Sequence, residues 1–389
     1  MTAACDDGFD PSWSATYATG TAGVDVCGND PADGAWLDEF LTPWCGRAAS
    51  GTGALQVRMI RSNRRARELT DEWTERRQHG PQPEPTPCIR LETRTLAFDR
   101  WAGTAGWRLA DPLTGCQFVV TGRRVDVIAP EGAHAGQLFL AGMIREALTG
   151  AVAAAGRVLD LHAAAFAVGG QAIVLTGRKR AGKTSLLCHA LLSGGGALIA
   201  NDRVFVHLDA APPVACGIPT VAALRQGTLD TFPRLREASA TFAPLPRLDG
   251  PADTGPPGSP SPEPAGLLLT LARLAGRLGA PQIARAPLRA ILLPEIAEDQ
   301  DGWVLERLPE AAAATQLAGC LHGGRVGGEA PTFFTALMRG DASPLPPVGD
   351  QLGRLVSQVP VYRFRLGPDV YRQPATCWLH ALATVEMPA

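Results

Sequence analysis

The chain has almost no lysine. Of its 36 Lys and Arg residues, only Lys179 and Lys183 are lysine, and both lie in one short stretch bounded by glycines. Arginine supplies the basic charge everywhere else, so a compact ammonium on a flexible stem is used only here. The scarcity of lysine therefore marks Lys183 as a candidate functional residue.

Closely spaced cysteines and an excess of charge are also missing. None of the nine cysteines forms a pair separated by two residues, which favours reduced, mostly buried thiols over a disulfide framework or a zinc site. The formal net charge of -2 argues against nucleic acid as a partner.

No apolar run has the uniformity that a membrane span requires. The most apolar segments, 138–156 and 266–278, are both interrupted by charged side chains. Asp6, Asp7 and Asp10 occupy the region where a secretory signal would carry a basic and then an apolar segment. We therefore expect a cytoplasmic protein with no membrane association.

The chain divides by texture into two parts. Residues 1–90 are expected to form a variable N-terminal region, followed by a catalytic domain over 91–389 with a proline-rich insertion at about 244–265. Trp36–Trp44 predicts a short amphipathic helix that docks on a larger body. Arg58–Arg77 predicts an arginine-rich helix, which is either solvated or a patch that binds an anion or a leader peptide.

Short alternating runs predict two β-hairpins. The first joins Gln117–Val120 to Arg124–Ile128, and a helix over Leu138–Ala155 follows it. The second joins Leu161–Val168 to Gln171–Thr176 through two glycines suited to positive φ. The strand before the glycine-bounded stretch is therefore antiparallel to its predecessor, whereas parallel sheets reached by crossovers are usual for such strands. The other predicted elements are a strand over Leu198–Val206, a helix over Leu268–Leu278, a strand over Leu288–Leu293, a helix over Glu310–Leu321 and a strand over Val361–Leu366.

The glycine-bounded stretch matches the phosphate-binding loop pattern GxxxxGK[ST] between a strand and a helix. Gly177 and Gly182 let the backbone curl so that N–H groups face phosphates, and the helix dipole adds to that field. Lys183 is expected to bridge the β- and γ-phosphates of ATP, and Thr184 to ligate Mg²⁺. The alternative is a glycine-rich turn before a helix. The expected nucleotide-binding set is Gly177, Arg178, Lys179, Arg180, Ala181, Gly182, Lys183, Thr184 and Ser185.

Three cations crowd the crown of this loop. Arg178, Lys179 and Arg180 either help to neutralise a triphosphate, bind a second anion on the acceptor, or are solvated charges at a loop tip. The sequence leaves the three interpretations open.

Three further residues are candidates for catalysis. Asp202, inside its predicted strand, is a candidate metal ligand or acid/base, or else a strand-end carboxylate bridged to Arg203 or a neighbour. His162 begins the strand before the phosphate strand, and is either a packed side chain or a catalytic residue. Arg225 is a candidate clamp for a phosphate or for the acceptor, because a guanidinium fork matches oxyanions, or a structural ion pair.

The order of these elements resembles the HPr serine kinase/phosphorylase catalytic domain and its relatives, which include kinases that tailor lasso peptides. The residues that carry the resemblance are Leu161-His162-Ala163, the stretch Gly177–Thr184, and Ala200-Asn201-Asp202. The resemblance implies a P-loop domain of the HPr kinase/PEP carboxykinase type, with a mixed sheet and flanking helices. It also implies Mg-ATP-dependent transfer of phosphate to a hydroxyl.

Two departures from the family pattern limit what is carried over. Asn201 stands where the family has the first of two adjacent acids, and an amide cannot act as a base, so the role falls to Asp202 or His162 or the chain is an altered catalyst. The segment that recognises HPr and the family's N-terminal domain have no counterpart, so HPr is not the expected substrate.

We therefore expect a kinase that phosphorylates Ser or Thr of a peptide or protein in a peptide-modification pathway. A small-molecule hydroxyl is an alternative acceptor. The competing class is a nucleotide-binding regulatory module without productive transfer. The sequence does not fix the number of subunits, and a homo-oligomer is compatible with it.

Overall fold

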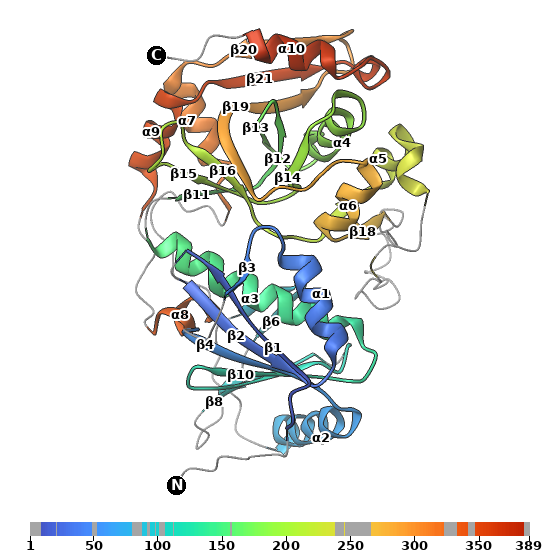
Figure 1. Ribbon diagram of the computed structural model, residues 1–389, viewed down its shortest axis with the longest axis vertical. Helices are drawn as coiled ribbons and strands as arrows, with labels where there is room; N and C mark the ends of the chain where they lie inside the picture. The colour runs from blue at the N-terminus through green and yellow to red at the C-terminus, as the bar shows by residue number, and fades with distance from the viewer. Residues whose placement is uncertain are drawn as a thin grey trace.

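The computed structural model is an α/β protein with mixed sheets and flanking helices (Figure 1). This confirms the expected mixed sheet with flanking helices. The structure describes residues 9–20, 22–48, 53–79, 88–91, 94–97, 99–100, 106–111, 113–155, 158–237, 245, 266–322, 333–340 and 347–384. Apart from Leu245, the predicted proline-rich insertion lies outside the described residues.

The first sheet has the strand order β3-β1-β2-β4-β10-β9-β8-β7. β4 pairs in parallel with β2 and with β10, and the hairpin of β9 and β10 is antiparallel, as predicted. The strands are β1 Trp13–Thr19, β2 Ala22–Gly28, β3 Gly46–Ala48, β4 Leu55–Arg61, β7 Asp99–Arg100, β8 Gly106–Ala110, β9 Gln117–Thr121 and β10 Arg124–Ala129.

This sheet overrides two boundaries drawn from the sequence. Strands on both sides of residue 90 belong to it, and β4 pairs directly with β10. The predicted division at residue 90 therefore falls inside one sheet. The predicted helix over Arg58–Arg77 begins later, since Leu55–Arg61 alternates between buried and less buried side chains as a strand does. The helix α2 covers Asn63–His79.

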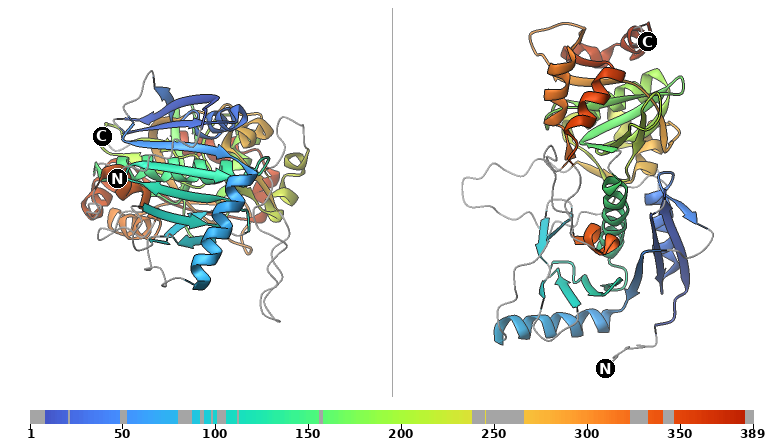
Figure 2. Two further views of the ribbon diagram at one scale, coloured as in Figure 1. Left: turned by 90° about the horizontal axis from the view of Figure 1, so that it is seen from below. Right: turned by 90° about the vertical axis from the view of Figure 1, so that its left-hand side faces the viewer.

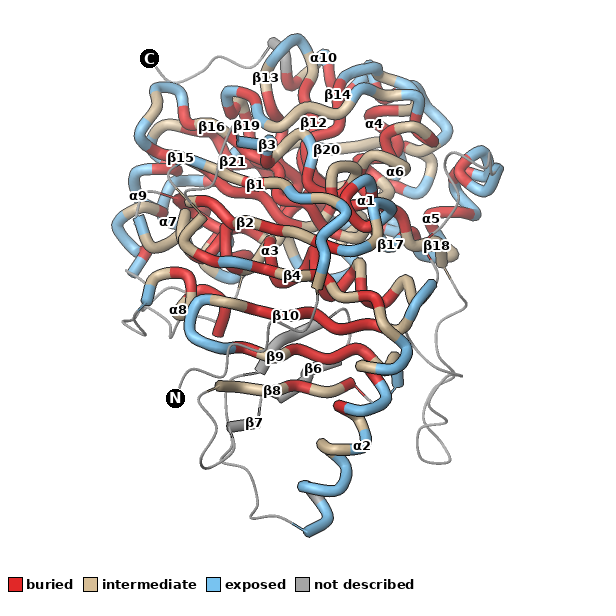
Figure 3. The backbone as a smooth tube through the Cα atoms, turned by 60° about the horizontal axis from the view of Figure 1, so that its bottom comes forward, coloured by how far each residue is buried: buried red, intermediate tan, exposed pale blue. Residues whose placement is uncertain are grey.

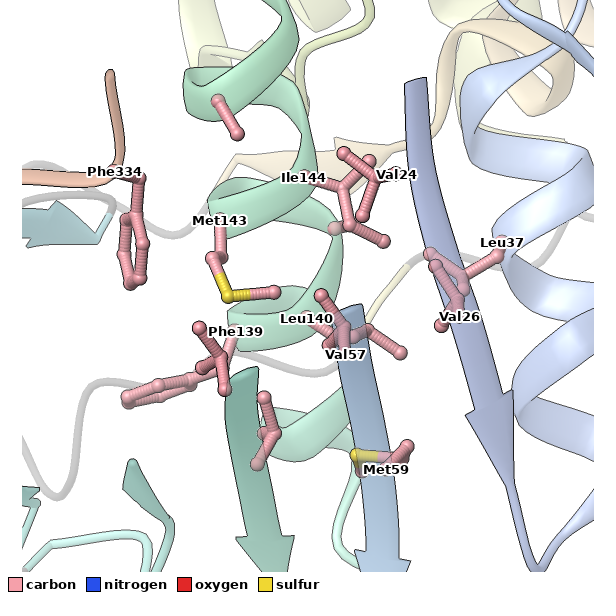
Figure 4. Close-up of a cluster of buried hydrophobic side chains, with 14 of the residues drawn as sticks. Val24, Val26, Leu37, Val57, Met59, Phe139, Leu140, Met143, Ile144 and Phe334 are labelled. Atoms are coloured by element: carbon pink, nitrogen blue, oxygen red, sulfur yellow. The ribbon is translucent and has the colours of Figure 1, made fainter. Parts of the chain in front are cut away.

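Helices cover both faces of the first sheet. On one face lie α1 (Pro31–Leu41), α3 (His134–Ala154) and α8 (Phe333–Arg339), and Figure 4 shows their apolar side chains meeting those of β2 and β4. Trp36, Leu37 and Phe40 of α1 are buried there, so a packed helix is present as predicted, but it begins before and ends before the predicted range of Trp36–Trp44. On the other face α2 packs through Ala66 and Leu69 and is otherwise largely exposed (Figure 3).

The second sheet has the strand order β11-β15-β16-β19-β13-β12-β14. In addition, β21 pairs with β19, and β20 pairs with β21. β12 and β13 form the predicted antiparallel hairpin, and the turn glycines Gly169 and Gly170 have φ of 58° and 77°. The strands are β11 Val158–Leu161, β12 Ala163–Val168, β13 Gln171–Thr176, β14 Ala197–Ala200, β15 Val204–His207, β16 Val214–Gly217, β19 Arg285–Ile296, β20 Trp303–Arg307 and β21 Val361–Leu366.

Alternate side chains of β12 and β13 enter two different cores. One core holds Phe166 and Leu175 with the helices α4, α6 and α10, and the other holds Ala165 and Val174 with α7 and α9. The second sheet is therefore sandwiched between helices. The helices are α4 Lys183–Gly194, α5 Gln226–Thr231, α6 Leu271–Leu278, α7 Glu310–Ala318, α9 Gly349–Gln358 and α10 Thr376–Thr384, with the 3₁₀ helices η1 Pro233–Arg236 and η4 Pro368–Arg372. Short ribbons complete the described elements: β5 Cys88–Leu91 with β6 Arg94–Ala97, and β17 Ala222–Leu224 with β18 Leu267–Leu269.

Helix α3 lies between the two sheets (Figures 1 and 2). Its inner face belongs to the core of the first sheet, while Val152 and Ala153 pack on a cluster that contains Val158 of the second. A salt bridge of 2.8 Å between Glu39 of α1 and Arg273 of α6 adds a polar link. The two sheets therefore form one packed body.

Two expectations from composition concern cysteine and the membrane. No described helix combines the length and the apolar character needed to cross a bilayer. The described cysteines are free thiols and most of them are buried, as expected: Cys27, Cys45, Cys116, Cys188, Cys216, Cys320 and Cys377.

Candidate functional site

The loop between β13 and α4 adopts a curled backbone. Gly177 and Gly182 have φ of 143° and 87°, a region that glycine enters without strain, and Arg180 has φ of 70°. Helix α4 begins at Lys183, the residue before Thr184. The two glycines of the motif thus occupy the positions where the chain needs them.

The Lys183 side chain folds back over this loop. It is only 9% exposed, and its Nζ donates hydrogen bonds to the carbonyl oxygens of Gly177 at 2.9 Å and Arg178 at 3.1 Å. Burial lowers the pKa of the Lys183 ammonium, and the nearby Asp202 carboxylate acts in the opposite direction. The ammonium therefore links the first residue of α4 to Gly177 and Arg178, the first two residues of the loop.

The N-terminus of α4 is open to an anion. Its cap residue is Gly182, which has no side chain to accept from the first-turn N–H groups, and those groups have no acceptor within the helix. The positive end of the helix dipole points the same way. Phosphate oxygens fit this donor set, whereas a side-chain cap would have blocked it.

The first turn of α4 also carries Thr184 and Ser185, both half-buried. Ser185 Oγ lies 3.0 Å from Thr228 Oγ1 of α5, so this hydroxyl is shared between two helices. Thr184 remains the loop hydroxyl that would serve as a Mg²⁺ ligand. No group of three or more His, Cys, Asp and Glu side chains within the described ranges could hold a metal; Mg²⁺ characteristically takes only one or two protein carboxylates together with phosphates.

His162 and Asp202 meet beside this loop. The His162 Nδ1 and Asp202 Oδ1 atoms are 3.5 Å apart, and the two side chains are 40% and 47% exposed. Thr176, the last residue of β13, donates its hydroxyl to the His162 carbonyl at 3.0 Å, and Ala163 N–H donates to the Asp202 carbonyl at 3.0 Å. Backbone contacts therefore fix both residues at the loop end of the hairpin.

The predicted strand over Leu198–Val206 is wrong in its middle. The chain runs as β14, which pairs with β12, and then as β15, which pairs with β11. The change of partner breaks the strand at 201–203, so Asp202 lies in a bend and not inside a strand. His162 likewise lies between β11 and β12. One strand, β12, separates β14 from β13, the strand that leads into the loop.

The His162 imidazole is biased toward its neutral form. Burial lowers the pKa of His162 from 6.5, and the positive charges of Lys183 and Lys179 act in the same direction against the opposing effect of Asp202. A neutral imidazole can accept a proton. The geometry thus offers a proton acceptor next to a carboxylate that can orient it.

Arg203 does not bridge to Asp202. Its guanidinium is held by Asp160, with Nη2 to Oδ2 at 2.5 Å and Nε to Oδ1 at 3.0 Å, and both side chains are buried. This carboxylate, which the sequence reasoning missed, leaves Asp202 available to His162. Asn201 is buried, and its Oδ1 has no hydrogen-bond partner among the described residues.

The remaining candidates lie around the loop. Arg178, Lys179 and Arg180 are exposed at its crown. Arg225 is exposed at the N-terminus of α5, the helix that contacts α4 through Thr228. The structure therefore brings His162, Asp202 and Lys183 together and places Arg225 on a neighbouring element.

Two side chains that carried no sequence signal also border the loop. A Cβ atom built on Gly182 would lie 3.4 Å from both Ile296 Cδ1 and Tyr371 Oη. They come from the end of β19 and from η4, far along the chain, and only the tertiary fold brings them to the loop.

No protein-family model matches the chain, and no curated protein matches it significantly.

Proposed function

We propose that the chain is a Mg-ATP-dependent phosphotransferase that acts on a hydroxyl, with Ser or Thr of a peptide or protein as the acceptor. The observation that carries the proposal is the meeting of His162 and Asp202 beside a loop whose Lys183 is folded over its own carbonyls. The antiparallel hairpin that feeds the loop supports a domain of the HPr kinase/PEP carboxykinase type.

Positioning and charge neutralisation would supply most of the catalysis. The open N–H groups of α4 and the Lys183 ammonium would bind the phosphates, with Thr184 and Asp202 holding Mg²⁺, whose charge offsets that of the phosphates when it is bound. The acceptor hydroxyl would lose its proton to His162 or Asp202 as its oxygen bonds to the γ-phosphorus. The bond from that phosphorus to the bridging oxygen breaks, and ADP leaves.

The test of the proposal is intact-mass spectrometry of candidate acceptors incubated with the protein and Mg-ATP. We expect an acceptor to gain the mass of one phosphate with the unaltered protein. Peptides and proteins expressed with this chain are the first candidates, and small hydroxyl compounds form a second set. ATP binding without any mass gain in either set would favour the regulatory alternative.

The regulatory alternative has one specific observation in its favour. Asn201, a neutral amide, is buried where the family resemblance implies an acid, and its Oδ1 has no partner within the described part of the chain. A module of this kind would bind nucleotide and exchange conformations without turnover.

Asp202→Asn distinguishes a phosphotransferase from a module that only binds nucleotide. The substitution keeps the size of the side chain but removes a base and a metal ligand, so we expect transfer to fall by about 10²-fold or more while nucleotide binding changes little. Acceptor-dependent ADP release and nucleotide affinity would be measured together. Asp209→Asn, which alters an exposed carboxylate on the turn after β15, is the matched control. Full transfer by Asp202→Asn would exclude this residue from the chemistry.

The pH dependence of transfer follows from the lowered pKa of His162. Because its folded pKa lies below 6.5, the imidazole is mostly neutral at neutral pH, and its charged fraction grows as the pH falls through that lowered pKa. We expect kcat/KM to be near its plateau at neutral pH and to fall as the pH drops through the lowered pKa of His162. His162→Gln should remove this acidic limb. If the limb persists unchanged in His162→Gln, another group is the base.

A further inference from the structure

The side of the loop at Gly182 is lined by residues that phosphate binding does not use. Ile296 Cδ1 and Tyr371 Oη each lie 3.4 Å from the position that a Cβ atom on Gly182 would take. The pair thus borders the cap of α4, next to the N–H groups assigned to phosphate.

The Tyr371 hydroxyl is buried and has no hydrogen-bond partner among the residues that the structure describes. Burial raises the pKa of Tyr371 to about 12, so the group keeps its proton and remains a donor. A buried polar group without a partner is destabilising, and native proteins satisfy nearly all such groups. Its position beside Gly182 indicates an acceptor that belongs to a ligand of this loop.

The phosphate-loop helix itself fixes the Tyr371 ring. His189 of α4 lies 2.8 Å from the Gln373 carbonyl through its Nε2, and Ala375 N–H donates to Ser193 Oγ of α4 at 3.0 Å. The His189 ring also packs edge-on against Tyr371 with centroids 5.5 Å apart. Because these contacts hold Tyr371 and the residues that follow it against α4, its hydroxyl is pre-positioned relative to the loop.

Ile296 presents apolar surface to solvent at the same place. It is 46% exposed, and the other large apolar side chains with such exposure in the described segments are Leu113, on the turn between β8 and β9, and Val304, on β20 two strands away in the same sheet. A polyphosphate has no apolar surface to place against Ile296. A nucleoside does, since its base and sugar combine apolar faces with hydroxyl groups.

We propose that Ile296 and Tyr371 contact the nucleoside half of the ligand, with Ile296 packing against the base or ribose and the Tyr371 hydroxyl donating to a ribose oxygen. The inference rests on the proposed nucleotide site and adds to it a reason for choosing a nucleotide over an inorganic polyphosphate. The preference for a nucleotide over a polyphosphate would come from Ile296 and Tyr371, which lie on one side of Gly182.

The test is calorimetric titration of the full chain with ATP and with inorganic tripolyphosphate, both in the presence of Mg²⁺. Ile296→Ser should weaken ATP binding about fivefold through lost apolar contact. Tyr371→Phe should weaken it about three- to tenfold through one lost hydrogen bond. Neither variant should change the affinity for tripolyphosphate.

Two matched controls accompany these variants. Tyr362→Phe removes another buried hydroxyl, on β21, that has no partner in the described part of the chain. Leu113→Ser removes another exposed apolar side chain, on the turn between β8 and β9. Neither control should alter ATP binding. Equal weakening of ATP and tripolyphosphate, or unchanged ATP affinity in both variants, overturns the inference while the nucleotide site stands. Failure of the unaltered protein to bind ATP overturns the proposed function and this inference with it.

Discussion

Lys183→Ala is expected to reduce phosphate transfer by about 10²- to 10³-fold, the usual effect of removing one positioned donor from developing charge in an active site. The ammonium is buried, and its present partners are two carbonyls of the loop, which can be exchanged for phosphate oxygens without moving the helix. Rates of acceptor phosphorylation at saturating Mg-ATP measure the effect, and circular dichroism confirms that the variant is folded.

Lys179→Ala shows whether the expected effect is specific to Lys183. It removes the other lysine of the chain, which is exposed at the crown of the same loop. An exposed charge pair contributes about 0.2–1 kcal/mol, so we expect a change in rate of no more than about fivefold. Comparable losses in both variants would assign the effect to the overall charge of the crown. A fully active Lys183→Ala would contradict the proposed phosphate site.

Asp33→Ala is expected to lower the free energy of unfolding by about 3–5 kcal/mol, because it leaves the guanidinium of Arg61 buried without its charge partner. Both Asp33 oxygens accept from Arg61, at 2.7 and 2.9 Å, and the side chains are 0% and 6% exposed. Arg61 Nη1 also donates to the carbonyls of Pro130 and Ala133, so the pair joins β4, α1 and the start of α3. Urea unfolding measures the change.

Two further variants sharpen the stability prediction. Arg64→Ala breaks the exposed pair of Arg64 and Glu68 on α2, and we expect a loss of about 0.3–0.5 kcal/mol. In the double variant Asp33→Ala/Arg61→Met the unpaired charge is gone, so it should be more stable than Asp33→Ala alone. If the double variant is less stable than the single one, packing and not the unpaired charge dominates.

Local signals in the sequence predicted the loop and the second hairpin well. The Gly169-Gly170 turn and its flanking apolar runs determine β12 and β13, and the motif glycines determine where α4 begins. Each of these features depends on neighbours along the chain. Where such neighbours decide the structure, sequence reasoning is reliable.

The first sheet was harder to predict because it is assembled from distant segments. The sequence assigns the second half of β4, Arg58–Arg61, to a helix because its arginines continue into α2, and only the parallel pairing of β4 with β2 and β10 defines it as a strand. Three residues around the candidate site escape prediction in the same way. Asp160, Ile296 and Tyr371 reach Arg203 or the loop through tertiary contacts that leave no periodic pattern in the sequence.

The position of α3 between the two sheets has a consequence for how the protein unfolds. The helix supplies Phe139 and Ile144 to the core of the first sheet, and farther along Val152 and Ala153 to the edge of the second. Neither sheet can lose its partner without exposing one end of this shared helix to water. We therefore expect the two halves to melt together, so that the proposed phosphate site depends for its stability on a sheet that contributes none of its side chains.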